Sequence, residues 1–129
     1  MTERQRERAF FEIFDNAYVG IGIMNEKVID LNNILQATFL AMATAVRQLT
    51  VSLPSEISGG TGFEKEVVLL VDGPHFKSDL PYNARRIIDG DAYSLSIACA
   101  SIVAKVTRDR ILKTYDSIYP QYGFKSHKG

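Results

Sequence analysis

Val67-Val68-Leu69-Leu70-Val71-Asp72-Gly73 is the stretch that decides the fold of this chain. An unbroken run of five apolar residues is typical of a strand buried on both faces, the usual state in a parallel sheet, so we expect an α/β fold. A carboxylate directly after such a strand emerges at the carboxyl edge of the sheet, where open α/β sheets bind ligands. Asp-Gly is equally common in turns, and the pattern alone does not separate a strand-ending turn from a binding residue.

A second carboxylate, Asp91, follows Gly90 at the start of a helix that we expect to run to about Tyr115, after a short strand at 84–88. The simpler interpretation of Asp91 is a helix N-cap, which stabilises a helix by about 1 kcal/mol. Magnesium and manganese ions prefer oxygen ligands, and a pair of such ions can promote displacement at phosphorus. A site of that kind usually needs several carboxylates, and the pattern supplies two candidates, Asp72 and Asp91.

Periodicity predicts the other elements. Residues 3–16 and 26–49 have the spacing of amphipathic helices. Residues 18–23 alternate and predict a strand with Gly20 and Gly22 on one face, so another element is expected to approach that face closely. Residues 52–66 and 73–83 are expected to be loops.

The composition is that of an ordinary globular protein, and 129 residues suit one domain or a piece of one. No stretch of 18 apolar residues occurs, so we expect neither a membrane span nor a membrane partner. The first eight residues are too charged for a signal peptide, which makes a cytoplasmic location the default expectation. Cys99 is the only cysteine, which excludes an internal disulfide and a cysteine-based zinc site.

Charge is distributed unevenly although the net charge is zero. Residues 1–72 contain six Lys and Arg against ten Asp and Glu, a net of −4. Residues 73–129 contain nine against five, a net of +4. A nucleic-acid partner for the basic half is one interpretation, and an ordinary solvated face is the other.

Several segments, taken together, resemble the ribonuclease HII family. Gly90–Arg110 resembles the signature helix of that family, and Tyr119–Gly129 resembles the conserved segment that follows it. Upstream, Gly20–Ile23 and Asn33–Thr38 also match. The resemblance covers nearly the whole chain, in the same order and at the same spacings.

The resemblance implies a ribonuclease H-like fold, a mixed sheet flanked by helices. It also implies cleavage of the RNA strand of RNA/DNA hybrids, or of DNA containing ribonucleotides, with Mg²⁺ or Mn²⁺ as the cofactor. Asp72 would be the third catalytic aspartate and Asp91 the fourth, and both would be metal ligands. Four basic side chains would lie near the nucleic acid, although each can equally be a solvated surface charge: Lys105, Arg108, Lys125 and Lys128.

The sequence departs from the family in one segment. Relatives carry Asp-Glu-Ala-Gly-Arg-Gly on a first strand that supplies two carboxylates and reads the ribonucleotide's 2′-hydroxyl, and no such sequence occurs here. We therefore expect residues 1–129 to form a partial ribonuclease HII catalytic domain with the first two strands absent. Strands 18–23 and 67–71 would lose the strands between them, and exposed strand edges invite misassembly. The isolated chain is expected to be marginally stable or disordered and to have no hydrolytic activity.

Two further functions stay open from the sequence. One is a non-catalytic nucleic-acid-binding remnant that uses the basic half of the chain. The other is an inert fragment, or one that works only by complementing another chain. Salt-dependent binding to a hybrid duplex would favour the first, and no binding at low salt would favour the second. No protein partner is evident.

Overall fold

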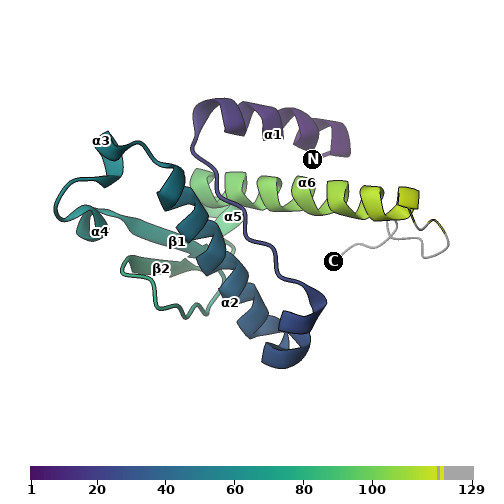
Figure 1. The fold of residues 1–129 in the computed structure, drawn as a ribbon. Helices are drawn as coiled ribbons and strands as arrows, with labels where there is room; N and C mark the ends of the chain where they lie inside the picture. The colour runs from purple at the N-terminus through teal and green to yellow at the C-terminus, as the bar shows by residue number, and fades with distance from the viewer. Residues whose placement is uncertain (119, 121–129) are drawn as a thin grey trace.

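The computed structural model describes residues 1–118 and residue 120, without the side chains at 26, 28, 29, 31 and 32. The described chain is rich in helix and contains a small parallel sheet, which is compatible with a partial ribonuclease H-like fold (Figure 1). Its elements are α1 (Glu3–Asn16), α2 (Glu26–Ser52), α3 (Ser55–Ser58), α4 (Phe63–Glu66), β1 (Val68–Asp72), β2 (Asn83–Ile87), α5 (Gly90–Tyr93) and α6 (Leu95–Ile118).

The sheet consists of β1 and β2, which pair in parallel from Val68 opposite Asn83 to Asp72 opposite Ile87. Both strands were predicted, but a mixed sheet is not present among the described residues. The expectation that the β1 strand is buried on both faces is wrong. Val71 is buried, whereas Val68 on the other face is 50% exposed, because no described element covers that face.

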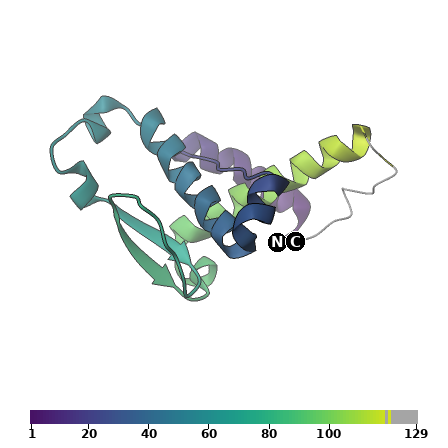
Figure 2. The same cartoon turned by 60° about the horizontal axis from the view of Figure 1, so that its bottom comes forward.

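The predicted strand at 18–23 is also wrong, because the described backbone from 17 to 25 is extended but pairs with no strand. It runs from the end of α1 across α2, as both views show (Figures 1 and 2). The predicted close approach is confirmed: a Cβ on Gly22 would lie 2.0 Å from the Ala41 carbonyl oxygen, and one on Gly20 would lie 2.2 Å from that of Ala45. The backbone of α2 therefore lies where a side chain would have to be.

A break at Asn33 divides α2 into two helical parts. The residue has a φ of 66° and a ψ of 165°, and its side-chain oxygen accepts a hydrogen bond from the Gln36 N–H at 3.0 Å. A side-chain oxygen that accepts from the N–H three residues on is the hydrogen-bond pattern of an N-cap, so the second part starts at Ile34 with its own cap. α2 ends at Ser52, slightly later than predicted, and the predicted loop at 52–66 contains the short helices α3 and α4.

Within the described residues, the stretch Asn33–Ser52 has the length and mean hydropathy (1.3) to cross a membrane by those two criteria alone. The absence of such a stretch was expected because the sequence has no unbroken apolar run of that length. In the described chain 11% of this window is buried, and the segment 17–25 packs directly on the helix.

α1 packs along α6 and closes the apolar centre of the molecule. Phe10 of α1 is buried together with Val103 and Val106 of α6. Ion pairs flank this centre: the Arg110 guanidinium lies 2.6 Å from the Glu7 carboxylate and 4.3 Å from the centre of the Phe10 ring, and Lys113 pairs with Glu3. The start of the chain is thereby fixed to the long helix that leads away from α5.

Candidate metal centre

The ends of β1 and β2 bring the two candidate carboxylates to one edge of the sheet. Gly73 donates its N–H to the Ile87 carbonyl oxygen at 3.0 Å, directly after the last strand pair. Gly73 has a φ of 100°, a left-handed conformation that favours glycine, and there the chain turns away from the sheet. The predicted position of Asp72 at the carboxyl edge is confirmed, although Asp72 is the last residue of β1 and not the residue after it.

The Asp72 carboxylate is exposed, and it accepts one hydrogen bond from the segment that follows β2. Its Oδ1 accepts from the backbone N–H of Gly90 at 2.8 Å. A Cβ on Gly90 would lie 3.4 Å from that oxygen and 2.6 Å from Cδ1 of the buried Ile97. Glycine at 90 therefore lets the backbone approach the carboxylate, and Oδ2 keeps no hydrogen-bond partner within the described part of the chain.

Asp91 follows the residue that holds Asp72, so the short helix α5 that bears Asp91 begins beside the end of β1. The predicted N-cap is wrong: Asp91 is the second residue of α5, and the N-cap is Asp89, in the left-handed region with a φ of 55°. The predicted single helix is divided too, because Ser94 is extended between α5 and α6 and α6 continues to Ile118. The exposed Asp91 carboxylate forms no ion pair or hydrogen bond with any described residue and is open to a ligand.

The donor set fits a hard divalent cation in kind. Two exposed carboxylates at one sheet edge provide oxygen ligands, which magnesium and manganese prefer. Within residues 1–118 and 120, no group of three or more Asp, Glu, His or Cys side chains lies close enough to hold a metal ion. The described part of the chain therefore offers a partial ligand set, consistent with the expectation that other carboxylates complete it.

The basic residues predicted to lie near nucleic acid have different positions. Lys105 is exposed on α6, ten residues or about 15 Å along the helix from its start at Leu95. Arg108 is half-buried one turn further on and takes part in other interactions. Lys125 and Lys128 lie outside the described residues. The structure thus does not bring these side chains together with Asp72 and Asp91.

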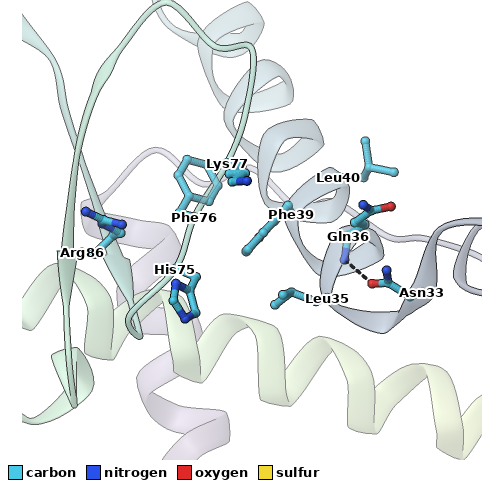
Figure 3. A pocket seen from close by; sticks show the side chains of 9 residues that line it. All are labelled: Asn33, Leu35, Gln36, Phe39, Leu40, His75, Phe76, Lys77 and Arg86. Carbon is cyan, nitrogen blue, oxygen red and sulfur yellow. Dashed lines mark hydrogen bonds between the residues drawn. The ribbon is translucent and has the colours of Figure 1, made fainter.

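A basic pocket that the sequence analysis missed lies beside the loop that follows Asp72 (Figure 3). It is open, has a volume of about 570 Å³ and is lined by Phe39 of α2, by His75, Phe76 and Lys77 of the loop, and by Arg86 of β2, among others. The Phe39 and Phe76 rings face each other edge to face, with centres 5.8 Å apart. The sequence shows two basic side chains soon after Asp72, His75 and Lys77, which could have indicated a basic site. Nothing in the sequence placed Phe39 opposite them.

Comparisons with known proteins agree with the resemblance. The sequence model of the family Ribonuclease HII matches residues 12–129. The Ribonuclease HII of Fusobacterium nucleatum subsp. nucleatum is 45% identical over 129 residues, which are 100% of this chain and 56% of the relative. That of Pseudothermotoga lettingae is 43% identical over 100% of this chain and 51% of the relative, and that of Citrifermentans bemidjiense is 47% identical over 99% and 50%. The chain spans about half the length of the curated relatives it matches.

Proposed function

Because the chain belongs to the ribonuclease HII family, we propose that it carries one half of the metal-dependent active site of an endoribonuclease that cleaves the RNA strand of RNA/DNA hybrids. The observation that supports this most is the hydrogen bond from the Gly90 N–H to Asp72, which couples the end of β1 to the loop bearing Asp91.

Asp72 and Asp91 are the residues that would hold the divalent cation, Mg²⁺ or Mn²⁺. Such an ion, when bound, supplies Lewis-acid chemistry that activates water and offsets the negative charge developing at phosphorus. The chain's own contribution is placement. The Gly90 N–H occupies one oxygen of Asp72, and this hydrogen bond together with the pairing of β1 with β2 holds the start of α5 at the end of β1.

Two carboxylates are fewer than this chemistry requires, so we propose that residues 1–129 alone do not hydrolyse a hybrid. The family resemblance assigns two further carboxylates to an Asp-Glu-Ala-Gly-Arg-Gly segment that these residues do not contain. A partial catalytic domain, a cytoplasmic location and the lack of a membrane partner stay predictions.

A nucleic-acid-binding role without catalysis is the second candidate. It is favoured by the net charge of +4 on residues 73–129 and by the exposed Lys105. The two candidates differ in what they require of Asp72 and Asp91, because a binding remnant has no use for a bound metal ion.

Paramagnetic broadening by Mn²⁺ in the chain labelled with ¹⁵N-glycine tests the metal site. Gly73 and Gly90 adjoin the two carboxylates, whereas Gly60 and Gly62 precede the opposite end of β1. We expect the amide signals of Gly73 and Gly90 to broaden first. Asp72→Asn or Asp91→Asn should raise the Mn²⁺ concentration needed by more than about 10-fold.

Asp15→Asn is the matched control, because it removes one exposed negative charge from α1. It should leave the broadening of Gly73 and Gly90 unchanged. Asp72→Asn keeps an oxygen that can accept from Gly90, so it separates lost metal binding from lost structure. Equal Mn²⁺ dependence in the wild-type chain and in both site variants would remove the support for a metal role.

A further inference from the structure

We propose that the basic pocket binds a backbone phosphate of the nucleic-acid strand that reaches Asp72. The pocket is defined by Phe39, His75, Phe76, Lys77 and Arg86. This inference rests on the proposed function and assigns to it a substrate-binding site separate from the carboxylates.

The charge of the pocket fits a phosphate. Two of the side chains that line it, Lys77 and Arg86, are positively charged, His75 can donate a hydrogen bond, and no acidic residue lines it. His75, Lys77 and Arg86 are exposed, and none of them forms an ion pair with an acid in the described chain. The only acid of the loop, Asp79, is held by Arg47 at 2.5 Å. The positive charge of the pocket is therefore available to an anion, and phosphate contacts by basic side chains dominate nucleic-acid affinity.

The aromatic rings fit the rest of a nucleotide. Phe39 and Phe76 are half-buried and pack edge to face, so together they present an apolar wall beside the basic side chains (Figure 3). A groove that combines basic residues with aromatic side chains is the usual design for binding a nucleic-acid strand, with the phosphates on the cations and the sugars or bases on the rings. A small inorganic anion would leave this wall unused.

The position of the pocket connects it to the carboxylates. Arg86 pairs with Val71, one residue before Asp72, so its side chain leaves the opposite face of the sheet from Asp72 but at the same end of the two strands. His75 is three residues after Asp72, which limits the separation of their Cα atoms to about 11 Å. Phosphates along one strand of a duplex repeat about every 3.4 Å of helix axis. A strand cleaved at Asp72 would thus place a phosphate at the pocket within about three nucleotides.

The test is fluorescence anisotropy with a labelled RNA/DNA hybrid duplex, without divalent metal, between about 50 and 200 mM NaCl. Lys77→Gln and Arg86→Gln are made singly, since both side chains are exposed and either variant can stand alone. Each lost phosphate contact should lower the slope of log affinity against log salt by about 0.9, so that affinity falls about threefold less over this range. Arg8→Gln is the matched control, because Arg8 is exposed on α1 and does not line the pocket.

The outcomes separate this inference from the function on which it rests. A lower slope in Lys77→Gln and Arg86→Gln, with an unchanged slope in Arg8→Gln, supports the pocket. Unchanged slopes in both pocket variants, while the wild-type chain binds the hybrid, overturn the pocket and leave the proposed function in place. No salt-dependent binding by the wild-type chain also overturns the pocket, and the proposed function is then judged by the Mn²⁺ broadening of Gly73 and Gly90.

Discussion

Gly20 and Gly22 show at the scale of single residues how closely the extended segment and α2 are packed. The carbonyl oxygens of Ala41 and Ala45 occupy the space where side chains at these glycines would lie. Those oxygens belong to helix backbone and cannot move aside as the end of a side chain can. Any larger residue at position 20 or 22 must therefore displace the segment from the helix.

Gly22→Ala should lower the free energy of unfolding by about 1–3 kcal/mol, the usual cost of overpacking. Urea unfolding followed by far-UV circular dichroism measures it, in buffer with trimethylamine N-oxide to strengthen burial. Gly60→Ala is the control, because a Cβ at Gly60 would meet no heavy atom within 4 Å. Equal stability of Gly22→Ala and the wild-type chain would show that this close packing does not exist in solution.

At the scale of elements, ion pairs fix α1 to α6. The hydrogen bond from Lys113 lowers the pKa of Glu3, and that from Arg110 lowers the pKa of Glu7. The hydrogen bond to Glu3 raises the pKa of Lys113. A lowered carboxyl pKa stabilises the packed state above the ordinary value of 4.5, and this contribution is lost as pH falls through the lowered value. The raised lysine pKa adds stability that is lost only in strongly alkaline solution.

We therefore expect the contact between α1 and α6 to weaken as pH falls below about 4. Nuclear Overhauser effects between the Phe10 ring and the Val106 methyl groups report on it. The double variant Glu3→Gln and Glu7→Gln should show weaker effects at neutral pH and little further change in acid. Glu12→Gln, which removes an exposed charge of the same helix, should behave as the wild-type chain does. If the contact between α1 and α6 weakens in acid as much in the double variant as in the wild-type chain, this acid sensitivity comes from other carboxylates.

The elements also show what sequence reasoning can and cannot predict. The strand β1 was predicted because an apolar run of five residues is a local signal, and the short strand expected at 84–88 is present as β2. Segment 17–25 has the alternation of a strand, but a strand also needs a neighbour with free backbone groups. Here the Ile21 N–H donates instead to the Gln48 side chain at 2.6 Å. The break at Ser94 was missed although serine is a preferred N-cap, and here the Ser94 Oγ accepts a hydrogen bond from the Ile97 N–H at 3.2 Å.

The candidate site was predictable to a similar extent. A carboxylate at a strand end and one beside a helix start follow from local sequence, and parallel strands place both at the same edge. The basic pocket did not follow, because Phe39, Phe76 and Arg86 are far apart in the chain and only the tertiary fold makes them neighbours. The contact of Asp72 with Gly90 was equally a property of the fold.

At the scale of the whole molecule, the chain leaves much apolar surface exposed. Val68 on β1 is 50% exposed, Ile23 of the extended segment 63% and Leu95 at the start of α6 82%. Apolar side chains that stay in contact with water contribute little to the free energy of folding. They support the prediction that residues 1–129 alone are marginally stable, and they agree with a chain that spans about half the length of its relatives.

A chimera tests the central claim, that Asp72 and Asp91 are half of a metal-dependent nuclease site, most directly. This chain replaces the matching 129 residues of the Fusobacterium nucleatum relative, and cleavage of the RNA strand of a hybrid is measured with Mn²⁺. We predict that the chimera cleaves, that Asp72→Asn and Asp91→Asn each lower its rate by more than about 100-fold, and that Asp15→Asn does not. Residues 1–129 alone should not cleave. Site variants of the chimera that keep the wild-type rate, or turnover by the isolated chain that Asp72→Asn abolishes, would contradict the account.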